Sequence, residues 1–426
     1  MPQTTALGHI LKSLRSPDLK VRESSKEALS KLLDGEEPLT PAEGLEALRA
    51  ASGPFPFDQP GPDELSEFLV DLAGKEPRPE YVPVIVSSYG KLGEEARTSA
   101  LGLLARLKGR DAAVAIMRIL ELHAEAGRVP GLVNAPLEAE PRHADVFFPA
   151  LFRYARVPKL ADDVYRLCLA YCQAGLLQPE ALAPHADQVV AAYRILAEKL
   201  RPAQRDGGVA WMWEDDYAES RFPAGLLLDL LGYFPALATE IELQRALEFR
   251  DPRLKAFAVA SLLRQGRTVN ESTVSEVVAH AEMRNYLYDE LRRRGKLALF
   301  PERHRTQEAL AESDMVSWLT FPTELGQVPD EIQLMKVVPI DTGLPGGVYD
   351  YFVFRFRTHE PHWAAKDGWM AGISGPFARA KEPTTEALGE TFSKFERWES
   401  KRPEEHVGDL QELMEEWREY HRRPRE

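Results

Sequence analysis

The segment from Trp211 to Phe222, WMWEDDYAESRF, is the most unusual in this chain of 426 residues and follows a flexible Asp-Gly-Gly turn. Aromatic rings and carboxylates together suit a partner that carries arginine or lysine, through cation–π contacts and ion pairs. We therefore predict a surface that binds a basic protein partner, with Arg221 orienting one of the carboxylates. The predicted surface consists of Trp211, Trp213, Asp215, Asp216, Tyr217 and Arg221.

The same segment has two other interpretations. In the first, Trp211 and Trp213 anchor a long loop to the core, while residues 214–216 face water or cap the next helix. In the second, Asp215 and Asp216 are the carboxylates of an enzyme that processes a small molecule, helped by Trp211 and Tyr217.

Two further groups have the residue types of metal sites. Cys168 and Cys172 lie four residues apart on one face of a predicted helix, without a second pair of ligands nearby. Free cysteines are among the most buried residues, so we predict that this pair packs in the core. His359, His362 and Asp367 could hold a divalent ion, but a loop that contains Pro361 favours a solvated turn. We expect neither a metal nor a cofactor.

Basic residues gather between Arg284 and Arg305, where seven stand against three acidic residues. Such a cluster could contact phosphates, but arginine also forms the solvated face of many helices, and the formal charge of the whole chain is −14. Nucleic-acid binding is therefore not expected. The sequence also lacks the GxxxxGK[ST], GxSxG and HExxH motifs. This favours a binding protein over an enzyme.

Roughly the first 310 residues predict one amphipathic helix after another. A recurring pattern of apolar, basic and small residues at helical spacing begins at residues 21, 96, 164 and 254. The intervals are 75, 68 and 90 residues, and half of each interval matches the length of a two-helix repeat. In a repeat array each helix pair covers its apolar face only with the neighbouring pairs.

The pattern is clearest in residues 16–33, 94–107 and 250–265, and there the chain resembles the HEAT-like repeats of α-solenoid proteins. The resemblance implies a helical repeat domain over residues 1–320 whose concave face holds another protein. It thus implies a non-enzymatic scaffold or adaptor, including an immunity-type partner. A minority of such solenoids are alkylpurine DNA glycosylases, which is the rival implication. That activity would require a basic concave surface.

After residue 320 the pattern becomes that of strands. Strands are predicted over residues 331–340, 348–357 and 368–374, with Phe352, Phe354 and Phe356 on one face. Two amphipathic helices should follow and cover this face, one around Phe392 and Phe395 and one over residues 407–417. The predicted fold class is α+β: a mostly helical solenoid capped by a small three-stranded antiparallel domain over residues 321–426.

The composition of the chain indicates its cellular location and its source. Only 2 cysteines argue against a disulfide scaffold, and no apolar run reaches the roughly 20 residues of a membrane span. The N-terminus lacks the apolar core of a secretion signal. We expect a cytoplasmic protein without a membrane partner. The preference for arginine over lysine, with abundant alanine and proline, indicates GC-rich coding and so favours a bacterial source.

Overall fold

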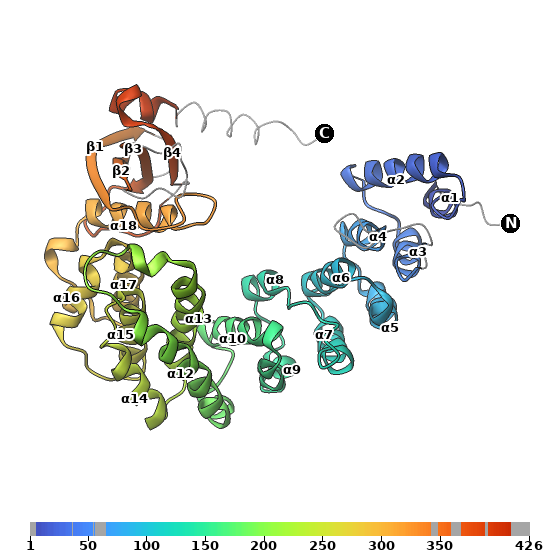
Figure 1. Ribbon diagram of the computed structural model, residues 1–426, viewed down its shortest axis with the longest axis horizontal. Helices are drawn as coiled ribbons and strands as arrows, with labels where there is room; N and C mark the ends of the chain where they lie inside the picture. The colour runs from blue at the N-terminus through green and yellow to red at the C-terminus, as the bar shows by residue number, and fades with distance from the viewer. Residues whose placement is uncertain are drawn as a thin grey trace. The chain divides into compact units, whose positions relative to one another are not determined.

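The chain forms two compact units, Met1–His185 and Ala186–Glu426. The computed structural model describes residues 6–35, 37–53, 55, 65–341, 348–358, 368–387 and 391–409. Both units contain helices and the second also contains an antiparallel sheet, so the class is α+β, as predicted (Figure 1). Residue 320 lies inside the second unit. The predicted domains 1–320 and 321–426 therefore stay a prediction about folding, which truncation tests below.

The first unit consists of two rows of helices that alternate along the chain (Figure 1). In each row, a helix contacts the helix two places later in the sequence. This pattern is compatible with a helical repeat solenoid. The even row is α2 (Leu19–Asp34), α4 (Leu65–Gly74), α6 (Glu94–Arg106), α8 (Asn134–Ala139) and α10 (Pro158–Gln173); the odd row is α1 (Ala6–Ser13), α3 (Pro41–Ala51), α5 (Val82–Ser88), α7 (Arg110–His123) and α9 (Ala144–Phe147).

In the second unit the same alternation holds for α12 and α14 and for α13, α15 and α17. Helices α13, α15 and α17 contact one another in sequence, α12 contacts α13 and α14, and α18 contacts α17. The helices of this unit are α12 (Ala186–Ala203), α13 (Asp215–Leu231), α14 (Leu237–Ala246), α15 (Pro252–Arg264), α16 (Glu271–Ala279), α17 (Ala281–Arg293) and α18 (Gln307–Leu319). The short helix α11 (Pro179–Leu182) precedes them, at the end of the first unit.

The spacing of the sequence pattern has a simple origin in these rows. The copies that begin at residues 21, 96 and 164 lie in α2, α6 and α10, and α4 and α8 lie between them. The pattern thus marks every second member of the even row, as the halved intervals predicted. The fourth copy lies in α15, which packs on α13 and α17.

Local signals explain where these helices begin. Thr40 and Glu43 form a capping box at the start of α3, with Pro41 in the first turn. At α15, Asp251 accepts a hydrogen bond from the Arg253 N–H at 2.9 Å, directly before Pro252. The Asp251-Pro252 pair, a helix-start signal in the sequence, is therefore the start of α15 in the structure.

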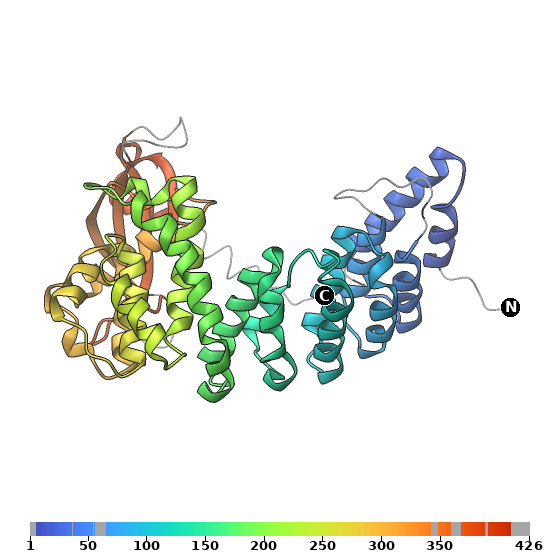
Figure 2. The ribbon, with the colours of Figure 1, turned by 60° about the horizontal axis from the view of Figure 1, so that its bottom comes forward.

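A four-stranded antiparallel sheet follows α18 in the order β1-β2-β3-β4. Phe352, Phe354 and Phe356 on β2 pack against Met315 and Leu319 of α18, so one helix covers this face, at the end of the α13–α15–α17 row (Figures 1 and 2). On the opposite face, a second cluster joins β2 and β3 to residues beyond β4. The strands are β1 (Glu331–Asp341), β2 (Val348–Arg357), β3 (Met370–Ala378) and β4 (Phe392–Arg397).

The three predicted strands are present, but two predictions about their cover are wrong. The segment with Phe392 and Phe395 is not a helix: it is β4, which pairs with Met370–Ile373 of β3. An unpaired β3 edge would leave backbone groups without partners, and this pairing satisfies them. The phenylalanine face is covered by α18, and Val407 in the described part of the final helix packs with the cluster on the other face. Residues 403–409 are helical, and the remainder of the predicted final helix, 410–417, lies outside the described residues.

A segment after β3 fastens the sheet to the helices. The Tyr288 hydroxyl donates to the Pro383 carbonyl at 2.9 Å, and the Thr385 hydroxyl donates to the Asp289 carboxylate at 2.9 Å. Gln307 exchanges two hydrogen bonds of 2.9 Å with the backbone of Thr384. Residues 383–385 therefore tie the sheet to α17 and to the start of α18, in addition to the apolar contact.

Because the sheet covers the apolar face of α18, a fragment that ends at residue 320 should be less stable than the whole chain. The fragment exposes Ala311, Met315 and Leu319, which are buried in the intact protein. We expect a lower midpoint of thermal unfolding, with binding of an apolar dye, measured beside the full chain. A fragment 1–320 that is monomeric and as stable as the full chain would show that the sheet caps nothing.

Candidate functional site

The predicted acidic–aromatic segment lies at the start of α13, after the 3₁₀ helix η5 (Ala210–Trp213). Trp211, Trp213 and Tyr217 are buried, with 5%, 8% and 4% of their surface exposed. Asp215 and Asp216 are exposed. The helical period explains this separation, because Tyr217 turns toward the core while the two aspartates before it face outward.

The buried rings pack against one another and against α13. The centroids of Trp211 and Tyr217 lie 4.8 Å apart in an edge-to-face arrangement, and those of Trp213 and Phe222 lie 6.0 Å apart. Burial raises the pKa of Tyr217, and the carboxylate of Asp251 adds to this increase. The tryptophans therefore anchor η5 to the core, as the structural interpretation predicted.

Arg221 pairs with carboxylates other than those predicted. Its guanidinium donates to Asp251 at 2.7 and 3.2 Å and to Glu282 at 2.7 Å. It lies over the ring of Trp213, with its central carbon 4.7 Å from the ring centroid. Arg221 is fully buried. The prediction that Arg221 orients Asp215 or Asp216 is therefore wrong, because Asp251 and Glu282 bind its guanidinium.

This buried arrangement continues across neighbouring helices. Arg253 of α15 contacts Glu282 at 3.2 Å, and Arg264 contacts Asp229 of α13 at 2.8 Å and Glu290 of α17 at 3.4 Å. Burial alone would lower the pKa of Arg221, but Glu282 and Asp251 more than offset this, so its pKa is raised. Burial dominates at Asp229, and its pKa is raised despite Arg264. These charges join α13, α15 and α17.

A pocket of about 400 Å³ opens beside the exposed aspartates, between α12 and α13. Trp211 and Tyr217 contribute to its wall, and Glu214, Asp216 and Glu219 bring three carboxylates to it. Two cations also line it, and one of them, Arg205, forms a bidentate pair with Glu214 at 2.5 and 2.6 Å. The pocket thus contains three of the predicted residues: Trp211, Asp216 and Tyr217.

The other candidate groups from the sequence are the cysteine pair, the basic cluster and the histidine-containing loop. Cys168 and Cys172 are buried on α10, which confirms the predicted core packing. Arg284 is buried and bonded to Glu312 at 2.8 Å, while Arg293 and Arg294 both pair with Glu290. Much of the basic cluster is therefore used within the fold. His359, His362 and Asp367 lie outside the described residues.

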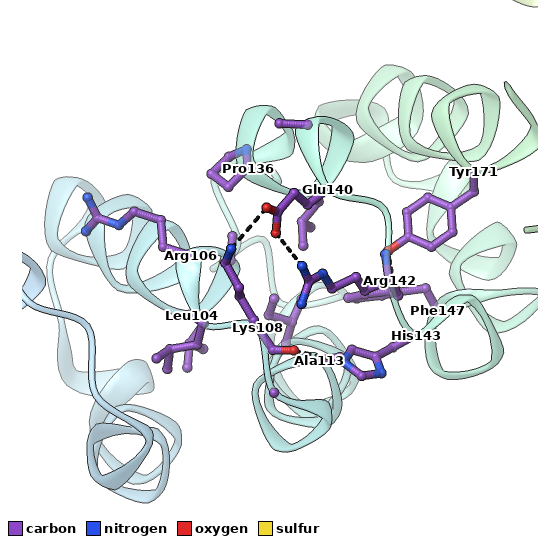
Figure 3. Close-up of a pocket in the computed structure, with 16 residues that line it drawn as sticks. Leu104, Arg106, Lys108, Ala113, Pro136, Glu140, Arg142, His143, Phe147 and Tyr171 are labelled. Carbon is purple, nitrogen blue, oxygen red and sulfur yellow. Dashed lines mark hydrogen bonds and ion pairs between the residues drawn. The ribbon is translucent and has the colours of Figure 1, made fainter. Parts of the chain in front are cut away.

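A second pocket, of about 250 Å³, lies in the first unit and was not predicted (Figure 3). Its walls come from the end of α6, the start of α7, the helices α8 and α9, and α10. Apolar side chains form most of the wall, and Lys108, Glu140, Arg142 and His143 stand at the two connecting loops. The apolar lining includes Leu104, Ala113, Ile116, Phe147 and the ring of Tyr171.

Polar contacts hold the two loops of this pocket together. The carboxylate of Glu140 bridges Lys108 at 3.0 Å and Arg142 at 2.8 Å, as Figure 3 shows. His143 has a left-handed backbone, with φ of 53°, and its Nε2 lies 3.0 Å from the carbonyl oxygen of Lys108. The hydrogen bond to Lys108 and the pairing with Arg142 lower the pKa of Glu140. Two cations thus converge on one exposed carboxylate beside an apolar wall.

One sequence signal could have pointed to this pocket. Arg106, Lys108 and Arg110 alternate in a five-residue run between two helical patterns, and Arg142 and His143 are adjacent in the corresponding loop of the next helix pair. In a repeat array, corresponding loops of successive pairs are neighbours. Aligning the repeats would have placed these cations together, whereas reading each loop alone did not.

The described residues contain no group of three or more histidine, cysteine or acidic side chains arranged to hold a metal ion. Within the same ranges, no helix has the length and apolar character needed to cross a bilayer. Comparison of the chain with protein-family models, with curated proteins and with solved structures found no match. Any functional interpretation therefore depends on the geometry described above.

Proposed function

We propose that the chain is a non-enzymatic scaffold or adaptor that binds a basic segment of another protein at the α12–α13 pocket. The observation that supports this most directly is the separation of roles within one segment. Trp211 and Tyr217 are fixed in the core and form part of the pocket wall. Asp216 is exposed and also lines the pocket, and the adjacent Asp215 is exposed on the same turn of α13. Rigid aromatic groups beside free carboxylates suit an arginine or lysine side chain.

The electrostatics of the pocket agree with a cationic occupant. Neither Asp215 nor Asp216 has an ion pair or hydrogen bond from another side chain among the described residues, and Glu219 also remains exposed. Glu214 already holds an arginine of this chain, Arg205, in a bidentate pair. This pair illustrates the contact that a partner arginine would make with the neighbouring carboxylates. In this proposal the helical rows hold the pocket in place and carry out no chemistry.

The double variant Asp215→Asn with Asp216→Asn tests the proposal, because it removes two charges with little change of shape. We expect a labelled hexa-arginine peptide, followed by fluorescence anisotropy at physiological salt, to bind the variant about tenfold more weakly than the parent. The stability loss should stay within about 1 kcal/mol per residue, since each aspartate supports only the first turn of α13.

The matched control is Asp187→Asn with Glu198→Gln, which makes the same charge change at exposed positions of α12 outside the pocket. Its peptide affinity should remain close to that of the parent. Equal weakening in both variants would show that only the net charge attracts the peptide, and the proposal would fail. Affinity purification from the source cells with the parent and both variants should then identify a basic partner that only the Asp215/Asp216 variant loses.

A further inference from the structure

We propose that the pocket lined by α6, α7, α8, α9 and α10 binds a carboxylate that is attached to a compact apolar body. The pocket lies wholly in the first unit, and its function is independent of the α12–α13 pocket in the second. Its ligand is of opposite charge. Three features of the described residues favour such a ligand: the apolar wall, the pair of cations and the carboxylate that already bridges them.

The apolar wall sets the body of the ligand. Leu104, Ile116 and Phe147 are part of the unit's core and also line the pocket, so the wall is rigid. A volume of about 250 Å³ accommodates a group of the size of one large side chain rather than a polymer. An aromatic ring or a short branched alkyl group placed there would exclude water from apolar surface.

The two cations set the head group. Lys108 and Arg142 approach each other from different loops because both contact Glu140. Their side chains remain largely exposed, at 64% and 47%, and each retains donors beyond the one it gives to Glu140. A carboxylate is the anion that these two groups already hold in the structure. A ligand carboxylate would add to Glu140 or replace it at the same donors.

Glu140 thus competes with the ligand carboxylate for the same two cations. Variants of this pocket should therefore either raise or lower the affinity for the ligand. The charge of Glu140 opposes a second carboxylate, so Glu140→Gln should strengthen binding about threefold to fivefold. Lys108→Gln together with Arg142→Gln should weaken binding about tenfold. Ala139→Trp, at an exposed position of the pocket edge, should block the pocket without disturbing the core.

The probes are N-acetyl-phenylalanine, its uncharged amide, and a hexapeptide that ends in phenylalanine with a free carboxylate. Isothermal titration with the full chain should show that the acid binds and that the amide binds at least tenfold more weakly. Tighter binding of the peptide than of the acid identifies a polypeptide C-terminus as the source, and equal binding identifies a small molecule. Arg118→Gln on α7, outside the pocket, serves as the control variant and should leave affinity unchanged.

Three results would overturn the proposal. The first is no binding of either acid to the parent and to Glu140→Gln at millimolar concentration. The second is equal affinity for the acid and the amide. The third is an unchanged affinity for N-acetyl-phenylalanine in both Glu140→Gln and the Lys108/Arg142 variant, when circular dichroism shows that both variants are folded.

Discussion

Replacing Arg221 by methionine should lower the free energy of unfolding by about 3–5 kcal/mol, the largest effect expected from one polar substitution in this protein. Arg221 is fully buried and is bonded to two acidic residues, Asp251 and Glu282, that are also buried. Methionine fills most of the space but leaves both carboxylates without their main counterion. The cost therefore comes from uncompensated charge rather than from lost contact area.

Urea denaturation followed by circular dichroism measures this change. Arg250→Met is the matched control, because Arg250 forms its ion pair with Asp206 at an exposed site, and we expect a change within about 0.5 kcal/mol there. Adding Asp251→Asn and Glu282→Gln to Arg221→Met should recover part of the loss. If the triple variant were less stable than Arg221→Met alone, the uncompensated carboxylates could not be the cause of the stability loss in Arg221→Met.

Truncation of Trp213 to alanine should also cost about 3–5 kcal/mol of stability, as expected when a large buried aromatic side chain is removed. The ring of Trp213 packs edge-on against Phe222 and lies under the guanidinium of Arg221. Its loss leaves a cavity and removes a cation–π contact at a desolvated site. Phe321→Ala provides the comparison, because Phe321 is 54% exposed and should contribute about 1 kcal/mol or less.

The two large effects should not be additive. Trp213 and Arg221 are in contact, so each single variant already removes their shared interaction, and the double variant should lose less than the sum. A Trp213→Ala variant of unchanged stability that fails to bind the arginine peptide would instead return this ring to the binding surface. Binding and stability measurements together therefore separate the two interpretations of the segment.

Sequence reasoning predicted those elements whose patterns depend on near neighbours in the chain. The helices that carry the 21, 96, 164 and 254 copies are present, and β2 spans Val348–Arg357 as predicted from its alternating phenylalanines. The strand at Phe392–Arg397 was missed because its apolar spacing also fits a helix, and only pairing with β3 decides between the two. At this segment, pairing with a strand that is distant in sequence determines the structure, and the local apolar pattern does not.

The candidate sites show the same limit. Part of the acidic–aromatic segment after Gly208 lines a pocket, but the division of this segment into buried rings and exposed acids depends on how η5 packs. The partners of Arg221 are 30 and 61 residues away in sequence, on neighbouring helices. The pocket at Lys108 and Arg142 likewise joins two loops that are distant in sequence. The pairs of Arg221 leave no periodic signal in a single sequence, whereas the two loops of the pocket become neighbours only once the repeats are aligned with one another.

The division into two compact units gives the protein an uneven optical signature. All seven tryptophans occur from Trp211 onward, so intrinsic tryptophan emission originates only in the second unit, which begins at Ala186. Circular dichroism, by contrast, records helices from both units. If the second unit unfolds cooperatively, ellipticity lost during denaturation at constant tryptophan emission therefore reports the melting of Met1–His185. The natural sequence thus resolves the two units spectroscopically without an added label.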